Sequence, residues 1–250
     1  MKIVALIASY KRDAILRDCL AQIIPQVDAV VLVGSSVWAE SKGTLQPTYG
    51  GSPIEKMIAK ELDLIYVDHR NHPLGQKWQA GLNKCREIKA DAVLICGSDD
   101  LITSGWVEEF RNIYKNEAML YGTSYWHVYN PVTDELIEVD YITDIRQDPI
   151  GAGRIVSKEL LDKLDWQIFP TEGGIGCDLY SYNLINRYIK SFWNRVCMGM
   201  LLSVKGNWNM LDSWQQLLNS KTLSICWKDA ELKKGILGYF PDVDFNKYRS

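Results

Sequence analysis

The sequence has no close pair of cysteines and no excess of positive charge. Its 6 cysteines are scattered over 250 residues, so neither a zinc-knuckle spacing nor a disulfide framework is visible. Such cysteines are typical of reduced, mostly buried thiols. Lys and Arg number 28 against 31 Asp and Glu, a net charge of −3, which offers no global positive field to a nucleic-acid backbone. No nucleic-acid partner is therefore expected.

Signals for secretion and membrane insertion are also missing. The first residues, MKIVALIASYKRD, contain only a short apolar run, with no signal-length hydrophobic region before a cleavage site. The longest uncharged apolar stretch near the end, Val196 to Val204, is too short to cross a bilayer. These absences predict a cytoplasmic protein without a transmembrane segment.

Several well-known catalytic motifs are absent too. The sequence has no Walker loop, no G-x-G-x-x-G after its first apolar run and no Ser-His-Asp grouping, which argues against P-loop, dehydrogenase and hydrolase functions. His69, His72 and His127 do not form a spaced metal-binding set. His127 stands in an aromatic run, where a packed or hydrogen-bonded histidine is more common than a metal ligand.

The N-terminal part alternates short apolar runs with segments of helical periodicity. The expected strands are Ile3–Ala8, Ala29–Val33, Leu64–Val67 and Ala92–Cys96. The expected helices cover residues 15–24, ended by Pro25, and then 53–62 and 76–88. This alternation predicts an α/β fold with a mainly parallel sheet and helices on both of its faces.

After residue 100 the pattern is less regular. Residues 104–116 predict a helix with Ser104 or Thr103 as its cap, and residues 119–135 predict aromatic strands that end in a hairpin. A helix- and aromatic-rich part begins near Ser157. No linker is visible, so this part is expected to dock on the sheet. Tyr and Trp side chains combine an apolar face with a polar tip, which suits stacking on sugars, and Tyr125, Trp126 and Trp208 are the candidates for such a contact.

The loop after the first expected strand carries candidate ligand-binding residues. In open parallel sheets, ligands bind beyond the carboxyl ends of the strands. Ala8, Ser9 and Tyr10 have the size and chemistry to border a base or ribose, and Arg12 to neutralise phosphate. The alternative is that Ser9 and Asp13 merely cap the next helix.

Asp99 and Asp100 follow the fourth expected strand. Two adjacent carboxylates repel each other unless positive charge lies nearby. Mg²⁺ or Mn²⁺, held by one carboxylate and the phosphates of a nucleotide, would supply that charge. Asp-Asp is also common in plain turns and at helix starts.

Together these segments resemble a known family. The segments, in order, are Ala8-Ser9-Tyr10-Lys11-Arg12, the strand end Val31 to Ser36, the stretch Asn71 to Asn83, and Gly97-Ser98-Asp99-Asp100. Their order is similar to that of the family 2 glycosyltransferases of the GT-A fold, over about residues 3–105. The resemblance implies a Rossmann-like catalytic domain, in which residues 1–105 form the nucleotide-sugar-binding half and residues 106–250 the acceptor-side half.

The resemblance also implies roles for single residues. Asp99 would face the ribose, Asp100 would coordinate the divalent cation and Lys77 would lie near the nucleotide. Ala8, Ser9, Tyr10 and Arg12 would border the base and the diphosphate. Two positions depart from the family pattern: Gly34-Ser35-Ser36 replaces an acidic residue that often binds the base, and Gly97 stands where many members have a further Asp.

The acceptor side is represented by two further segments. Residues 151–159 resemble the family's small-residue strand that leads into a helix, and residues 171–178 form a glycine-rich loop that ends in an acid. In inverting members a carboxylate from this region deprotonates the acceptor hydroxyl. Asp178 matches that base best and Glu172 is second. The alternative is that Asp178 is a helix cap and Glu172 a solvated loop acid.

The resulting hypothesis is a metal-dependent, hexosyltransferase-like enzyme. It would move a sugar from a nucleotide diphosphate-sugar to an acceptor hydroxyl of unknown identity, with inversion and with Mn²⁺ or Mg²⁺ as cofactor. One alternative is an inactive module of the same fold that binds a carbohydrate or nucleotide. The other is a sugar-1-phosphate nucleotidyltransferase, whose usual glycine-rich first loop is lacking here.

Overall fold

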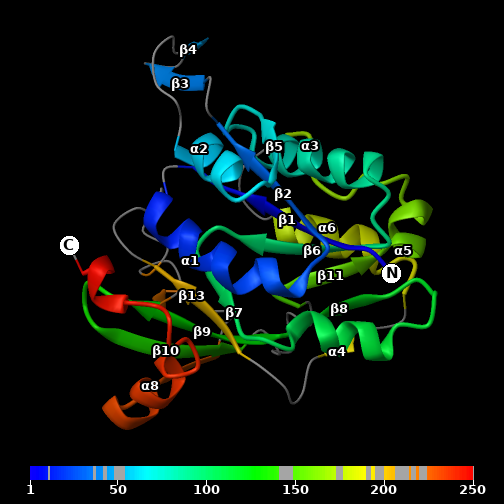
Figure 1. The fold of residues 1–250 in the computed structure, drawn as a ribbon. Helices are drawn as coiled ribbons and strands as arrows, with labels where there is room; N and C mark the ends of the chain where they lie inside the picture. Colours follow the sequence, from blue (N-terminus) through cyan, green and yellow to red (C-terminus); the bar gives the residue numbers. More distant parts are fainter. Residues whose placement is uncertain are drawn as a thin grey trace.

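The computed structural model describes most of the chain in two main sheets. The described residues are 1–10, 12–35, 38–41, 44–47, 54–140, 149–172, 177–189, 193–194, 200–205, 214, 218–219 and 224–249. The larger sheet has 7 strands, and a second sheet has 5. In Figure 1 the smaller sheet lies below the larger sheet, and α2 (Ile54–Glu61) and α3 (Leu74–Glu87) lie above the larger sheet.

The 7-stranded sheet has the order β12-β8-β11-β6-β1-β2-β5. Its bounds are β1 Ile3–Ala8, β2 Ala29–Gly34, β5 Ile65–Asp68, β6 Ala92–Gly97, β8 Leu120–Gly122, β11 Arg154–Ser157 and β12 Trp193–Asn194. The four N-terminal strands are mutually parallel, and β11 runs antiparallel to β6. The predicted parallel sheet is confirmed, with each predicted strand within one residue of its observed bounds.

The 5-stranded sheet has the order β14-β10-β9-β13-β7. Its bounds are β7 Asp100–Ile102, β9 Tyr125–Asn130, β10 Glu135–Asp140, β13 Leu201–Val204 and β14 Ser224–Trp227; a separate pair joins β3 Trp38–Ser41 and β4 Thr44–Pro47. The hairpin expected after the aromatic run is the β9–β10 pair. The C-terminal part, which composition marks as helix-rich, therefore also contributes strands to both sheets.

The helices follow the predicted segments closely. Besides α2 and α3, the described helices are α1 Asp13–Ile23, α4 Trp106–Ile113, α5 Lys158–Lys163, α6 Cys177–Ile185 and α8 Ala230–Leu237, with short 3₁₀ turns at Ile24–Gln26 and Phe245–Tyr248. The predicted cap of α4 is wrong. Gly105, with φ 87°, is the N-cap residue and no side chain caps the helix, because the Thr103 hydroxyl instead accepts a hydrogen bond from the Met200 amide at 2.7 Å.

The faces of β1 explain why its sequence is apolar throughout. Ile3, Ala5 and Ile7 belong to a core shared with α1, α4 and the second sheet. Val4 and Leu6 face the other way, into a core with α3, α5 and α6. A strand covered on both sides must be apolar at every position. Because the first core contains residues from both parts of the chain, the described segments pack as one body, and the functional division at residue 105 stays a prediction.

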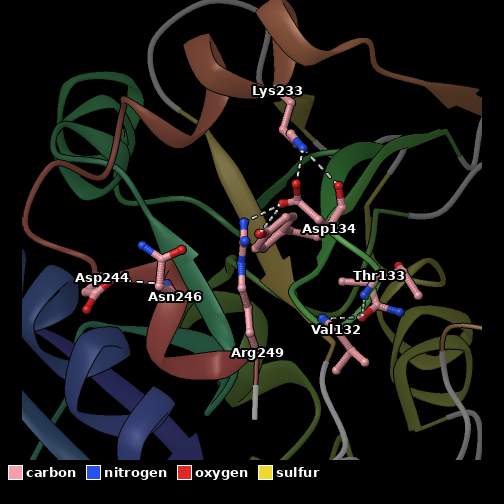
Figure 2. Close-up of polar contacts among 9 residues, drawn as sticks. Val132, Thr133, Asp134, Lys233, Asp244, Asn246 and Arg249 are labelled. Carbon is pink, nitrogen blue, oxygen red and sulfur yellow. Dashed lines mark hydrogen bonds and ion pairs between the residues drawn. The ribbon is translucent and has the colours of Figure 1, made fainter.

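The C-terminal residues tie the two sheets together. Asp134, in the turn between β9 and β10, accepts hydrogen bonds from Lys233 on α8 at 2.7 Å and from Arg249 at 2.9 Å (Figure 2). The Tyr129 hydroxyl donates to the same carboxylate at 2.8 Å. Two residues before Arg249, Lys247 pairs with Asp18 of α1 at 2.7 Å. The end of the chain thus links the second sheet to a helix of the first.

Within the described residues, no helix combines the length and the apolar composition that a bilayer crossing requires.

Gly153 occupies a position that only glycine fits, and this generates a stability prediction. Its φ is +74°, and a Cβ there would lie 2.7 Å from the ring of the buried Trp106, whose Nε1 donates to the Gly153 carbonyl at 2.9 Å. We expect Gly153→Ala to lower the free energy of unfolding by about 1–3 kcal/mol, measured by urea titration.

Gly235 of α8 is the matched control, because a Cβ there meets no atom within 4 Å. Gly235→Ala should raise the free energy of unfolding by up to about 1 kcal/mol, since alanine is the better helix former. Equal effects of the two substitutions would contradict the assignment of strain to Gly153.

Candidate functional site

The carboxyl ends of three parallel strands meet at one edge of the large sheet. Ala8, the last residue of β1, lies beside Val33 of β2 and beside Gly97 of β6. The loops that follow these strands therefore converge, as their positions in the sequence predict. They bring polar groups together in two clusters, one around Asp99 and Asp100 and one around Lys77.

The acidic cluster is built on Asp99, whose side chain is buried. Its Oδ1 is 2.8 Å from Arg12 Nη1, and its Oδ2 is 2.9 Å from Lys205 Nζ. Arg12 is the residue directly before α1, whereas Lys205 follows β13 and lies 106 positions after Asp99. Lys205 reaches this position because the Val204 amide donates to the Asp99 carbonyl at 2.9 Å. One carboxylate is thus held between two cations from opposite ends of the fold.

Asp100 is bonded differently, to neutral donors. The Gly97 amide donates to its Oδ2 at 2.9 Å, and the Ser203 hydroxyl donates to its Oδ1. A side chain at position 97 would collide with this carboxylate. The glycine that departs from the family pattern is therefore required for Asp100 to fold back over the end of β6.

The pKa values of the two carboxylates are shifted in opposite directions. Burial alone would raise the pKa of Asp99, but the charges of Arg12 and Lys205 outweigh it and the pKa is lowered. The pKa of Asp100 is raised, first by burial and then by the negative charge of Asp99. The charge of Lys205 acts against this shift, but no described cation forms an ion pair with Asp100, so Asp100 is the carboxylate that an added cation would stabilise more.

The second cluster surrounds Lys77 of α3, whose side chain is 1% exposed. Its Nζ donates to the Ser9 carbonyl at 2.5 Å, to Ser35 Oγ at 2.9 Å and to Asn71 Oδ1 at 3.1 Å, and it lies 5.7 Å from the centre of the Tyr10 ring. Lys77 therefore lies beneath the loops after β1 and β2 and holds them together. A direct contact between Lys77 and a nucleotide stays a prediction.

Burial lowers the pKa of Lys77 to about 7, although the charges of Glu55 and Asp68 act in the opposite direction. The three oxygen acceptors compensate part of the cost of desolvation.

The capping alternative for the first loop is wrong. Arg12 is the N-cap residue of α1, and no side chain makes a capping hydrogen bond there. The Ser9 hydroxyl is buried and has no hydrogen-bond partner among the described residues. Ser9 is thus not used as a cap, which leaves its predicted role beside a ligand open.

The two candidate bases, Asp178 and Glu172, are both exposed. Asp178 is the second residue of α6, which begins at Cys177, so Asp178 is not the helix cap. Its carboxylate lies where a side chain on Gly151 would be. Glu172 directly follows Thr171. The backbone carbonyl of Thr171 accepts a hydrogen bond at 2.7 Å from the side chain of Gln76 at the start of α3. Their catalytic roles stay predictions.

The aromatic candidates have mixed positions. Trp126 is buried in the core, Tyr125 is exposed, and Trp208 lies outside the described residues. His127 is buried, with Nε2 3.4 Å from Glu138 Oε2, as expected for a packed histidine.

Sequence reasoning missed Ser203 and Lys205. In the sequence, the stretch from Val196 to Val204 is distinguished only as an uncharged apolar run too short to cross a bilayer. The sequence does show a cation directly after an apolar strand. Nothing in the local sequence indicates that β13 pairs with β7, and this pairing places Ser203 and Lys205 beside the acidic pair.

Within the described part of the chain, no three His, Cys, Asp or Glu side chains group as a metal-ligand set. Asp100 nevertheless fits a hard cation that takes one or two carboxylates and completes its coordination with phosphate oxygens and water, because no described cation forms an ion pair with this buried carboxylate, whereas Asp99 has two such partners.

Similar folds occur among solved structures. Crystal structures of residues 1–349 of TarS from S. aureus, a GT-A-type glycosyltransferase, match 96% of this chain. Without ligand, the match covers 71% of the TarS chain with a TM-score of 0.51; in the complex with UDP-GlcNAc it covers 72% with a TM-score of 0.54. This chain has a GT-A-like fold. Sequence identity is 13% in both cases, so the likeness concerns the fold. No protein-family model and no curated protein matches the sequence.

The buried Lys77 of this GT-A-like chain predicts a specific pH dependence of stability. Its folded-state pKa of about 7 lies below the usual 10.5. Between these values the unfolded chain binds more protons, so the contribution of Lys77 to stability rises with pH. From pH 7 to 8.5 the parent should gain about 1.5 kcal/mol relative to Lys77→Met. Urea titrations of both proteins at the two pH values measure this difference, and parallel pH profiles would contradict it.

Proposed function

We propose that this chain transfers a sugar from a nucleotide diphosphate-sugar to an acceptor hydroxyl. The observation that carries the proposal is the acidic pair at the end of β6, flanked by Arg12 and Lys205, at the ligand-binding edge of a GT-A-like fold. That a TarS structure contains UDP-GlcNAc supports a nucleotide-sugar donor and makes this molecule the first ligand to try.

Arg12 and Lys205 are suited to bind a diphosphate. Their side chains are 22% and 20% exposed, whereas Asp99 between them is 4% exposed. Each cation can therefore keep its contact with Asp99 and still present N–H donors to an anion outside. A guanidinium and an ammonium in this position would stabilise the charge that develops on a departing nucleotide diphosphate.

A divalent cation, Mn²⁺ or Mg²⁺, is part of the proposal. Asp100 would hold it, with Asp99 facing the ribose. When bound, such an ion neutralises the phosphates of the leaving group. Ala8, Ser9 and Tyr10 would border the nucleoside, on the loop that Lys77 supports from below.

The acceptor hydroxyl would be deprotonated by Asp178, with Glu172 as the second candidate. Both carboxylates are exposed and belong to the part of the chain proposed to bind the acceptor, and a base on the face of the sugar opposite the leaving group would give inversion. The hexosyltransferase-like class belongs to the same proposal.

The decisive test is donor hydrolysis with water as acceptor. The protein is incubated with Mn²⁺ and a panel of UDP-GlcNAc, UDP-glucose, UDP-galactose and GDP-mannose, and release of the nucleotide diphosphate is followed. Metal-dependent release from one donor supports the transferase. Metal-dependent binding of UDP by calorimetry without release from any donor would instead favour an inactive nucleotide-binding module.

Asp100→Asn should remove the contribution of the metal to nucleotide binding. The amide keeps the size of the carboxylate but loses its charge, so the gain in UDP affinity on adding Mn²⁺ should fall tenfold or more, roughly the effect of losing one charged ligand. Calorimetry with and without Mn²⁺ measures it. Glu87→Gln, which removes a surface ion pair with Lys84, is the control. An undiminished Mn²⁺ effect in Asp100→Asn would contradict the metal assignment.

Arg12→Met and Lys205→Met should each weaken binding of UDP more than binding of uridine, because their charges act on the diphosphate. A loss of roughly tenfold for UDP is expected of one charged contact. Arg17→Met is the matched control, since Arg17 lies on α1, five residues after Arg12, and pairs with Glu61 at the surface. Equal losses for UDP and uridine would place these cations away from the phosphates.

A further inference from the structure

Arg154 is a buried cation on the acceptor side. It is the first residue of β11 and is 1% exposed. Its Nε donates to the Ile150 carbonyl at 2.8 Å, and its Nη2 donates to the Pro149 carbonyl. Its Nη1 donates to the Asp178 carbonyl at 2.9 Å. One planar guanidinium therefore joins the segment before β11 to the first turn of α6.

Ser181 completes this junction. Its hydroxyl accepts a hydrogen bond from Arg154 Nη1 at 2.9 Å and donates one to the Asp178 carbonyl at 2.9 Å. Ser181 is itself 3% exposed. The backbone of Asp178 is thus held from two directions while its side chain stays exposed.

The segment that Arg154 holds also sets the space for the Asp178 carboxylate. Gly151 directly follows Ile150, and the Asp178 carboxylate occupies the volume that a Cβ on Gly151 would fill. Gly151 does not have a φ in the left-handed region, so its backbone conformation is open to other residues. What favours glycine here is the carboxylate above it.

The register of the sheet brings this junction to the edge where the acidic cluster lies. Arg154 pairs with Ile95 of β6, and the Gly153 amide donates to the Ile95 carbonyl at 2.8 Å. Asp99 and Asp100 follow four and five residues after Ile95 on the same strand and its turn. The residues before Arg154, Gly151 included, therefore extend past the same end of β6.

From this geometry we infer that Arg154 is a positioning residue. It fixes the Asp178 carboxylate over Gly151, where Asp178 would deprotonate the acceptor hydroxyl. The inference rests on the proposed function. Arginine suits this task because its rigid fork of N–H donors reaches several carbonyls at once, whereas a lysine ammonium is a point charge on a flexible stem. A misplacement of about 1 Å can cost on the order of a hundredfold in rate.

A double-mutant cycle tests the inference with the panel donor that the parent hydrolyses fastest. Asp178→Asn should lower kcat for hydrolysis roughly a hundredfold, and Arg154→Met about tenfold or more. Because Arg154 acts through Asp178, the double variant should be no slower than Asp178→Asn alone. The donor KM and the affinity for UDP should stay near the parent values. Arg154→Lys should recover part of the lost rate.

Gly151→Ala provides a second test that leaves Arg154 in place, in case Arg154→Met fails to fold. The added methyl group must push the Asp178 carboxylate aside, so kcat should fall about tenfold with an unchanged donor KM. In the Asp178→Asn background the same substitution should cost nothing further. Gly235→Ala, which adds a methyl group in open space, is the matched control and should hydrolyse donor at the parent rate.

The outcomes separate this inference from the proposed function. If the parent hydrolyses no donor in the panel, the proposed function fails and the inference fails with it. If the parent is active but Gly151→Ala keeps its full rate, or the losses from Arg154→Met and Asp178→Asn add, only the inference is overturned. An active Asp178→Asn variant would also overturn it and move the base to Glu172.

Discussion

The carboxylates of Asp99 and Asp100 are buried next to each other, and much of the fold serves to make this possible. Two such charges repel strongly away from water. In the structure, Arg12 and Lys205 form ion pairs with Asp99, and the Gly97 amide and the Ser203 hydroxyl donate hydrogen bonds to Asp100. Lys205 follows β13 of the second sheet, so this sheet has to pack against the first for Lys205 to reach Asp99. The acidic cluster is therefore complete only when the two sheets are docked.

Two other buried cations organise loops rather than carboxylates. Lys77 gathers the loops after β1 and β2 around its ammonium, and Arg154 gathers the segment before β11 and the start of α6 around its guanidinium. Both bind backbone carbonyl oxygens, which are plentiful where strands end. A charge buried in this way specifies the path of the chain, because each unmade hydrogen bond to it would be costly.

The GT-A-like architecture relates these features to the proposed function. A donor bound at the end of β6 would meet Arg12 and Lys205, while an acceptor would approach from the side of α6 and Asp178. The two sides are built on neighbouring strands, β6 and β11. Their relative placement is thus set by a rigid sheet, which is the arrangement that a two-substrate transfer requires.

The sequence by itself determined the parallel sheet, its helices and the position of the acidic pair at a strand end, because these follow from hydrophobic periodicity and from local order along the chain. It did not determine that Lys205 would join Asp99, or that Arg154 would hold Asp178. Those pairings connect residues 106 and 24 positions apart and depend on strand order and register. Only the tertiary structure decides such contacts, because burial and hydrogen bonding select partners by their position in space.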